Sequence, residues 1–451
     1  MKAAINSFFV KESHCPYSLA AQSISRYCNQ KGQKVRMVAS KLEAPCKGVE
    51  DLLSSDSGVI GFSSNYVTEP YVIEMINKIK QERRGEVFVV VGGPSVTYSS
   101  RDSRIRQSEA DLFVRGDGEK AFCEILEKGP ISVLRGKTKI QGVSTKQNFS
   151  ESVASTPLSA LPSVFPIDFV TDHVYWETVR GCAFNCIYCA HPGQKKQFRE
   201  VPLERVKKEI EYLERKSFRA IYITDPILGG RKSRSKEILR LLKRLKGSFI
   251  TAEYRPEYLD EEVLDLLEWA QIGWLEFGLQ TTNPNLSYFR KNDPTVLDKL
   301  RRLEKRDIKY SLDLIVGIPG DTRDSFIDSL RFAIEEARPT SLRVFPLRVY
   351  DGTRLHQMAQ NNELWDYDKE TRIIKRSHTF NEEEFLEWMR LGRTISHFNR
   401  FLNSNNWFGN ESKFRSLSFL VSVFNLVGNR IPDEYNEEEI KKLWEKIQNG
   451  R

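Results

Sequence analysis

Two successive series of strand-like and helix-like segments constrain the fold of this 451-residue chain more than any other feature. Amphipathic helical patterns at residues 70–84 and 119–129 alternate with short apolar segments typical of buried parallel strands. This alternation predicts an α/β fold with a doubly wound sheet, which binds ligands at the carboxyl ends of its strands. The five segments are AAINSFFV, KVRMVA, GVIGFS, VFVVVGG and ADLFVRG, at residues 3–10, 34–39, 58–63, 87–93 and 110–116.

The second series begins near residue 172 and contains six strand-like segments with helical patterns between them. Six βα units predict a partial (β/α)6 TIM barrel with its active site at the carboxyl rim of the strands. The six segments are at residues 174–180, 220–225, 249–254, 273–280, 310–317 and 341–347. We therefore predict a doubly wound domain, a linker rich in Pro and Ser, a barrel and a helical C-terminal region, at residues 1–130, 131–168, 169–375 and 376–451.

Composition argues against several other classes of protein. The longest apolar run, SFLVSVFNLV at residues 418–427, is too short to span a membrane, and the N-terminus lacks a signal-peptide pattern. An odd number of cysteines, seven, with three of them clustered, does not suit a disulfide framework. The net charge of +8 is spread over helices as on solvated faces. We therefore expect a cytoplasmic protein with no membrane partner and no nucleic-acid partner.

The segment RGCAFNCIYCAHPG places Cys182, Cys186 and Cys189 at C-x3-C-x2-C spacing after the first strand of the second series. Soft thiolates at this spacing favour an iron–sulfur cluster, zinc or copper(I). Iron–sulfur cubes are often held by four cysteines, so three would leave one iron open to a small molecule. A zinc site closed by His191 as its fourth ligand stays an alternative at this point.

This segment resembles the cluster loop of the radical SAM (S-adenosylmethionine) enzymes. Gly181 before the first cysteine and Tyr188 before the last belong to the resemblance, as does the position after the first strand of a six-unit barrel. The resemblance implies a [4Fe–4S] cluster on Cys182, Cys186 and Cys189, with SAM bound to the open iron. It also implies reductive cleavage of SAM to a 5′-deoxyadenosyl radical that abstracts hydrogen from the substrate.

The same resemblance suggests SAM contacts at the ends of later strands. It implies that Asp225 accepts a hydrogen bond from the SAM amino group, although a helix N-cap would suit this residue equally well. Polar contacts to SAM are implied for Glu253, Arg255, Glu276 and Gln280, with an ion pair inside the barrel as the alternative.

One glycine is implied to lie along the adenine of SAM. Gly317, in LDLIVGIPGDT, would let the ring approach the backbone, and turn formation explains the same glycine. No residue is assigned a catalytic role in proton or hydrogen transfer.

The first domain resembles the Rossmann-like cobalamin-binding domain that precedes the barrel in one subgroup of radical SAM enzymes. The matching features are Ser63 at a G-F-S strand end, Gly92 and Gly93 in a G-G-P turn, and the loop RGDGE at residues 115–119. Two adjacent glycines would permit close approach of a nucleotide tail to the strand end. The resemblance therefore implies cobalamin as a third cofactor.

The cobalt ligand is less clear in this sequence. Many cobalamin proteins carry D-x-H-x-x-G after the first strand, where the His replaces the lower cobalt ligand. His14 follows Glu12 at this interval, but Tyr17 stands in place of the Gly. His14 is therefore either a cobalt ligand or a loop residue hydrogen-bonded to its own backbone.

The combined resemblance predicts a cobalamin-dependent radical SAM enzyme that methylates an unactivated carbon of a small-molecule or peptide substrate. We expect a reductant such as flavodoxin or ferredoxin as a partner. A rearrangement or cyclisation enzyme is an alternative, as is a cobalamin-binding sensor that lacks catalysis. A methylthiotransferase acting on tRNA or protein is a further alternative, and its second cluster would need Cys15, Cys46 and Cys123. The helical pattern around Cys123 favours a core position instead.

Overall fold

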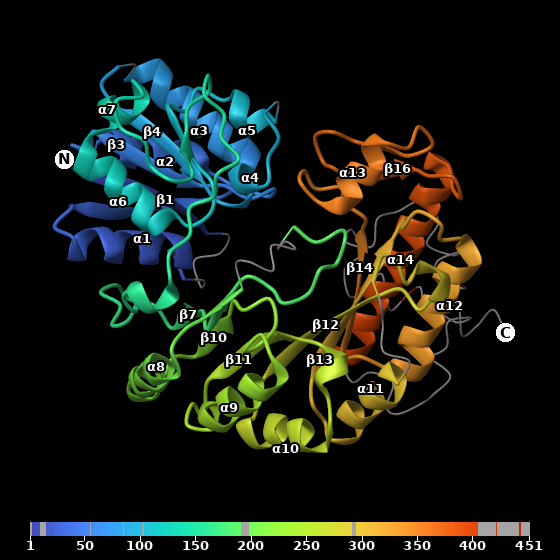
Figure 1. Ribbon diagram of the computed structural model, residues 1–451. Coiled ribbons are helices and arrows are strands. Elements are labelled where there is room, and N and C mark those ends of the chain that lie inside the picture. Colours follow the sequence, from blue (N-terminus) through green and yellow to red (C-terminus); the bar gives the residue numbers. More distant parts are fainter. Residues whose placement is uncertain are drawn as a thin grey trace. The chain divides into compact units, whose positions relative to one another are not determined.

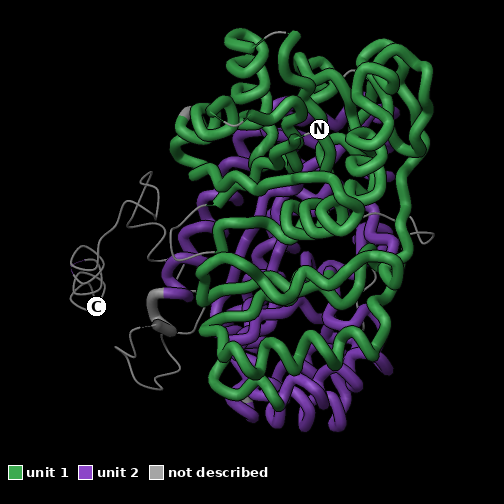
Figure 2. The backbone as a smooth tube through the Cα atoms, turned by 90° about the vertical axis from the view of Figure 1, so that its left-hand side faces the viewer, with its two compact units in different colours: residues 1–183, 194–225, 244–248 green, residues 184–193, 226–243, 249–451 purple. Residues whose placement is uncertain are grey.

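The computed structural model describes residues 2–9, 15–54, 56–83, 85–101, 103–190, 198–290 and 295–404, with residues 421 and 442. The chain divides into two compact units, which Figure 2 shows in green and purple. Unit 1 comprises residues 1–183, 194–225 and 244–248, and unit 2 comprises residues 184–193, 226–243 and 249–451. Among the described helices, none is long and apolar enough to cross a membrane.

The first sheet has six strands in the order β2-β1-β3-β4-β5-β6. All neighbours are parallel except β5 and β6, which are antiparallel. The order changes direction between β1 and β3, and ligands of such sheets bind at the carboxyl ends of the strands near this point. The strands are β1 (Ala3–Phe9), β2 (Val35–Lys41), β3 (Val59–Ser63), β4 (Phe88–Gly92), β5 (Leu112–Val114) and β6 (Val143–Ser144).

Helices cover both faces of this sheet because its strands are apolar on both sides. Ala3 and Ile5 pack into a core with residues of α1 and α6, whereas Ala4 packs into a second core with residues of α2 and α3. Figure 1 shows α1 and α6 side by side on one face. The helices are α1 (Leu19–Gln30), α2 (Pro45–Leu53), α3 (Glu69–Glu82), α4 (Pro94–Thr97), α5 (Arg104–Gln107), α6 (Gly118–Lys128) and α7 (Pro130–Leu134).

The second sheet has six strands in the order β14-β13-β12-β11-β10-β7, so neighbouring strands follow one another in the order of the chain. The pairs β7–β10, β11–β12, β12–β13 and β13–β14 are parallel, as expected for successive βα units. The strands are β7 (His173–Trp176), β10 (Ala220–Ile223), β11 (Phe249–Tyr254), β12 (Trp274–Gln280), β13 (Tyr310–Val316) and β14 (Ser341–Pro346).

Helices alternate with these strands, and several begin at a side-chain cap. Asp260 accepts a hydrogen bond from the Val263 amide at 2.8 Å, and Thr322 forms a capping box with Ser325. The helices are α8 (Leu203–Lys216), α9 (Lys232–Leu242), α10 (Glu261–Ala270), α11 (Val296–Lys305), α12 (Arg323–Arg331), a π-helix (Phe332–Ala337), α13 (Arg354–Gln360) and α14 (Glu382–Ser404). Short 3-10 turns are η1 (Leu158–Ala160), η3 (Pro256–Tyr258) and η4 (Pro284–Leu286), and β15 (Asp366–Tyr367) pairs with β16 (Ile374–Arg376).

The predicted α/β class is confirmed, with a doubly wound first sheet, a partial barrel and a helix at residues 382–404. Two details differ from the sequence-based expectation. The segment predicted as a linker contributes β6 to the first sheet. The strand predicted at residues 174–180 is interrupted after Trp176, and its last part forms β8 (Val179–Arg180), which pairs antiparallel with β9 (Arg199–Glu200).

Candidate functional site

The loop that carries the three thiols is closed at its base by a two-stranded ladder. Val179 lies opposite Glu200 and Arg180 lies opposite Arg199, so the loop starts at Gly181 and returns at residue 198. Residues 191–197 lie outside the described residues, and they include His191. The zinc site predicted as an alternative therefore stays untested.

The three cysteines are half-buried, and none forms a disulfide. Cys182 belongs to unit 1, whereas Cys186 and Cys189 belong to unit 2, where the Cys189 amide donates to the Cys186 carbonyl at 3.2 Å. In the described part of the chain, no three His, Cys, Asp or Glu side chains are grouped closely enough to hold a metal ion. The role of the three sulfurs as a joint ligand set therefore stays a prediction.

Arg255, predicted as a SAM contact, lies beside Cys186. Its guanidinium forms a hydrogen bond with the Cys186 side chain, stacks 3.8 Å above the ring of Phe184 and donates to both carboxylate oxygens of Glu257. Arg255 is 8% exposed. A buried positive charge beside this sulfur suits a site with anionic thiolate ligands, so the residues around Cys186 fit an iron–sulfur cluster.

Asp225 has a structural role that the sequence did not suggest, and its predicted contact with SAM stays a prediction. Its Oδ1 accepts hydrogen bonds from the amides of Thr178 and Val179 at 2.6 and 3.0 Å, and its Oδ2 accepts one from the Thr178 hydroxyl. The residue is 1% exposed. The N-cap prediction is wrong, because the next helix starts at Lys232. Asp225 instead fixes the backbone where β7 ends and the base of the thiol loop begins.

Charged side chains line the inner face of the strands in unit 2. Arg343 donates to Glu276 at 2.7 Å and to both oxygens of Asp313 at 2.6 and 2.7 Å. The ion pair predicted as an alternative for Glu276 is therefore present. Within the described residues, the carboxyl group of Glu253 has no such partner, although Glu253 lies opposite Glu276 in the sheet register. These four side chains supply three carboxyl groups and one guanidinium, which suits a cationic ligand.

The electrostatics of this face raise two carboxyl pKa values. Burial, together with the charges of Glu276 and Asp313, raises the pKa of Glu253 from 4.5 to about 7, although the side chain still reaches solvent. Burial also raises the pKa of Asp313, against the opposing effect of Arg343. Both shifts favour retention of a proton, because burial disfavours the charged form and the neighbouring carboxylates repel it.

The variant Glu253→Gln is expected to change the pH dependence of stability. A folded-state pKa of about 7 against 4.5 means that protonated Glu253 stabilises the fold at low pH, and this contribution is lost as the pH rises through about 7. The urea midpoint of the variant, measured relative to that of wild type, should therefore rise as the pH increases from about 5 to about 8. Glu237→Gln, on the exposed side of α9, is the control. If the difference in urea midpoint between wild type and Glu253→Gln stayed the same across this pH range, the expectation would be contradicted.

Gln280 and Gly317, two predicted SAM contacts, have local structural roles. Gln280 ends β12 at a register shift and has a left-handed φ of 73°. A Cβ on Gly278 would lie 2.3 Å from the side-chain Nε2 of Gln280. Such backbone strain in a non-glycine residue is concentrated at functional sites. A Cβ on Gly317 would lie 2.7 Å from Phe385 and 2.8 Å from Ile374. Packing of α14 and β16 therefore requires this glycine, independently of any adenine ring.

The carboxyl edge of the first sheet carries the residues predicted to bind cobalamin. Ser63 ends β3 and Gly92 ends β4. A Cβ on Gly93 would lie 2.6 Å from the Ser64 carbonyl oxygen, so contact within the chain already requires this glycine. The buried hydroxyl groups of Ser64 and Ser95 lack a hydrogen-bond partner among the described residues. Two unsatisfied hydroxyls at this edge fit a polar ligand. His14 lies outside the described residues.

The cysteines proposed for a second cluster do not suit metal binding. Cys123 is 2% exposed and packs in the core of the first domain, as its helical pattern predicted. Burial raises the pKa values of Cys15 and Cys123 to about 11, which disfavours the thiolate form that metals require. The side chain of Cys46 lies outside the described part of the chain.

Sequence reasoning missed Asp313 and Arg343, which organise the inner face of unit 2. Both stand inside the predicted strands YSLDLIVG and SLRVFPL. A charged residue within an apolar strand pattern was the available signal, because such residues are buried only when they are paired.

Comparisons with known proteins agree with both domains. The family described as the B12 binding domain matches residues 10–126, and the Radical SAM superfamily matches residues 176–333. An uncharacterized methyltransferase of Pyrococcus horikoshii is 26% identical over 68% of this chain and 71% of its own length. The cobalamin-dependent radical SAM methyltransferase TokK of Streptomyces tokunonensis is 26% identical over 62% of this chain, and the match spans 45% of TokK.

A solved structure shares the fold across both domains. The radical S-adenosylmethionine methyltransferase TsrM of Kitasatospora setae, with cobalamin and a [4Fe-4S] cluster bound, superposes with a TM-score of 0.68 at 15% identity. The superposition covers 95% of this chain and 100% of TsrM. The two matched domains imply a [4Fe–4S] cluster, SAM and cobalamin as cofactors. The chain therefore combines an N-terminal B12-binding domain with a radical SAM domain, which is the domain organisation of cobalamin-dependent radical SAM enzymes.

Proposed function

We propose that this enzyme transfers a methyl group from SAM to an unactivated carbon atom of a small-molecule or peptide substrate. When bound, the cofactors supply the electron and the radical that activate the substrate, and the methyl group that replaces its hydrogen. One observation carries the proposal. Within unit 1, Asp117 at the carboxyl edge of the first sheet contacts Arg180, two residues before Cys182. The cobalamin edge and the base of the thiol loop therefore belong to one connected structure.

The residues of unit 2 would bind and orient SAM. SAM carries a cationic sulfonium and an ammonium group, and the inner face with Glu253, Glu276 and Asp313 has more negative than positive charge. Glu253 supplies the accessible carboxylate, while Arg343 holds the other two in place. Arg255 would stabilise the negative charge of the thiolate at Cys186. Gln280 and Gly317 would act on SAM through the local structure that they support.

The substrate class rests on relatives and not on a site of this chain. TokK is named as a methyltransferase of this cofactor type, and its similarity extends over 62% of this chain. Flavodoxin or ferredoxin would provide the electron.

The products of SAM test the proposed reaction. Anaerobically reconstituted enzyme is incubated with methyl-deuterated SAM, titanium(III) citrate and the low-molecular-weight fraction of a cell extract. We expect S-adenosylhomocysteine and 5′-deoxyadenosine in equal amounts, with a new product that carries the deuterated methyl group. Formation of 5′-deoxyadenosine without S-adenosylhomocysteine would indicate that the enzyme catalyses a rearrangement or cyclisation instead of methyl transfer. Absence of any SAM cleavage by iron-loaded enzyme would overturn the proposal.

Iron content separates this proposal from a methylthiotransferase. One cluster per chain requires about four iron atoms, whereas a second cluster would raise the content to about eight. The burial of Cys123 supports the lower value.

A further inference from the structure

The loop Arg115–Glu119 resembles a cobalamin-domain motif, but its two carboxylates are occupied by arginines from the base of the thiol loop. Asp117 accepts hydrogen bonds from Arg180 at 3.1 Å and from Arg199 at 3.0 Å. It also accepts one from the Thr156 amide at 2.6 Å. Its side chain is 7% exposed. The Asp117 carboxylate thus contacts both Arg180 and Arg199, which form the residue pair of the β8–β9 ladder next to the loop.

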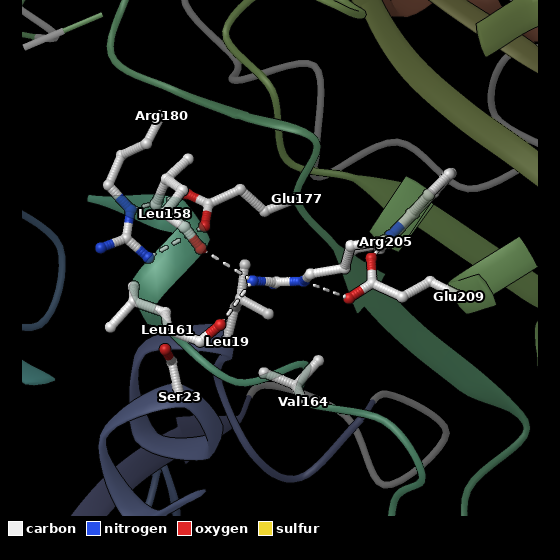
Figure 3. A pocket seen from close by; sticks show the side chains of 10 residues that line it. Leu19, Ser23, Leu158, Leu161, Val164, Glu177, Arg180, Arg205 and Glu209 are labelled. Atoms are coloured by element: carbon white, nitrogen blue, oxygen red, sulfur yellow. Dashed lines mark hydrogen bonds and ion pairs between the residues drawn. The ribbon is translucent and has the colours of Figure 1, made fainter. Parts of the chain in front are cut away.

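Two further carboxylates hold Arg180 from other directions. Glu119 accepts from Arg180 at 3.0 Å and also accepts from the Ser23 hydroxyl at 2.7 Å. Glu177 accepts two hydrogen bonds from Arg180, each at 2.9 Å, and Figure 3 shows this pair beside a small cavity. The cavity has about 10 Å³ of space, which suffices for about one water molecule. Arg180 is therefore fixed by three acidic side chains at once.

We propose that Asp117 and Glu119 are positioning residues that fix both ends of the thiol-bearing loop to the carboxyl edge of the N-terminal sheet. This role goes beyond the proposed reaction, although its effect on the cluster rests on that proposal. The β8–β9 ladder has only two residue pairs, which is too short to hold a long loop unaided. The ion pairs at Arg180 and Arg199 supply the missing constraint.

Burial distinguishes this cluster from ordinary surface ion pairs. The side chains of Glu119 and Arg199 are 4% and 17% exposed, and Arg180 is 23% exposed. Exposed pairs contribute little to stability, whereas removal of one partner from a buried pair leaves a charge without compensation. Loss of the Asp117 charge would leave two adjacent guanidinium groups at the base of the loop with less compensation.

The variant Asp117→Asn tests the proposal in the reconstituted holoenzyme. We expect iron to be released to the chelator bathophenanthroline about tenfold faster or more, as for other residues that support metal ligands. Cobalamin bound per chain, measured by absorbance, should equal that of wild type. The control is Asp111→Asn, which removes a carboxylate paired with Lys80 directly before β5 in the same domain. The control variant should lose iron and cobalamin at the same rates as wild type.

Amide hydrogen exchange on the cofactor-free protein gives a second readout. The Val201 amide, which donates to the Thr178 carbonyl at 2.9 Å, should exchange faster in Asp117→Asn than in Asp111→Asn. Asp117→Glu, which keeps the charge, should restore much of the protection. This readout stays valid if wild-type protein binds no iron, an outcome that would overturn the proposed function alone.

Two results would overturn the positioning role. Loss of cobalamin with unchanged iron release would show that the loop binds cobalamin directly. Iron release and Val201 exchange equal to those of wild type in Asp117→Asn would show that the ion pairs do not fix the loop.

Discussion

The variant Cys186→Ala is expected to abolish reductive cleavage of SAM. The cluster would lose one of its three thiolate ligands, and Arg255 would lose the side chain that it contacts. We expect the rate of 5′-deoxyadenosine formation to fall by at least about a thousandfold, since the uncatalysed reaction contributes almost nothing. The measurement is anaerobic incubation of the reconstituted variant with SAM and titanium(III) citrate, with iron content and the absorbance of the cluster followed in parallel.

A matched control removes a thiol without approaching the loop. Cys28 is fully buried in the same core as Cys123, within the first domain. Cys28→Ala should cost about 1 kcal/mol of stability, as is typical for point variants, and should retain iron and SAM cleavage. If Cys186→Ala cleaved SAM at a wild-type rate, Cys186 would not be a ligand of the cluster, and other residues would have to complete the cluster site.

Long elements were predictable from sequence because their periodicity is strong. Eleven strand segments were predicted, and every strand of the two sheets except β6 starts or ends within a few residues of one of them. The short strand β6 was missed because two residues carry no periodic pattern. Its pairing with β5 depends on contacts with residues 112–114. The chain between the two domains therefore could not be assigned from composition alone.

The interruption of the strand at residues 174–180 also depends on a distant residue. The apolar pattern of VYWETVR continues through Thr178, so the sequence favours one strand. In the structure, Asp225 takes hydrogen bonds from the amides of Thr178 and Val179 that a continuous strand would use in its ladder. The side-chain partner lies 47 positions away from Thr178, so local patterns do not reveal it.

The contacts of the candidate site residues could not be predicted from the sequence. Charged and glycine positions at strand ends were identified from sequence, but their partners could not be. Gly317 is required by Phe385 and Ile374, which approach it from later parts of the chain. Glu276 pairs with Arg343, which was not among the predicted residues. Sequence motifs indicate where chemistry takes place, whereas long-range packing decides which side chain contacts a ligand and which one supports it.

The variant Asp225→Ala is expected to cause the largest loss of stability among single changes near the thiol loop. The change would leave two buried backbone amides and the Thr178 hydroxyl without their acceptor. Each unsatisfied buried group costs about 1–3 kcal/mol, and water that enters the vacated space recovers part of this. We expect the free energy of unfolding to fall by about 3 kcal/mol, measured by urea denaturation of the cofactor-free protein.

Asp225→Asn separates this structural role from direct binding of SAM. The amide oxygen can still accept from the amides of Thr178 and Val179, so this variant should lose only about 1 kcal/mol of stability. Its KM for SAM should stay close to that of wild type, because the side chain faces the backbone of unit 1. If the carboxylate instead bound the SAM amino group, Asp225→Asn would raise KM strongly, and Asp225→Ala would leave the urea midpoint unchanged. The burial of Asp225, at 1% exposure, and the three hydrogen bonds that it accepts favour the first outcome, since a carboxylate with these partners has little capacity left for a ligand.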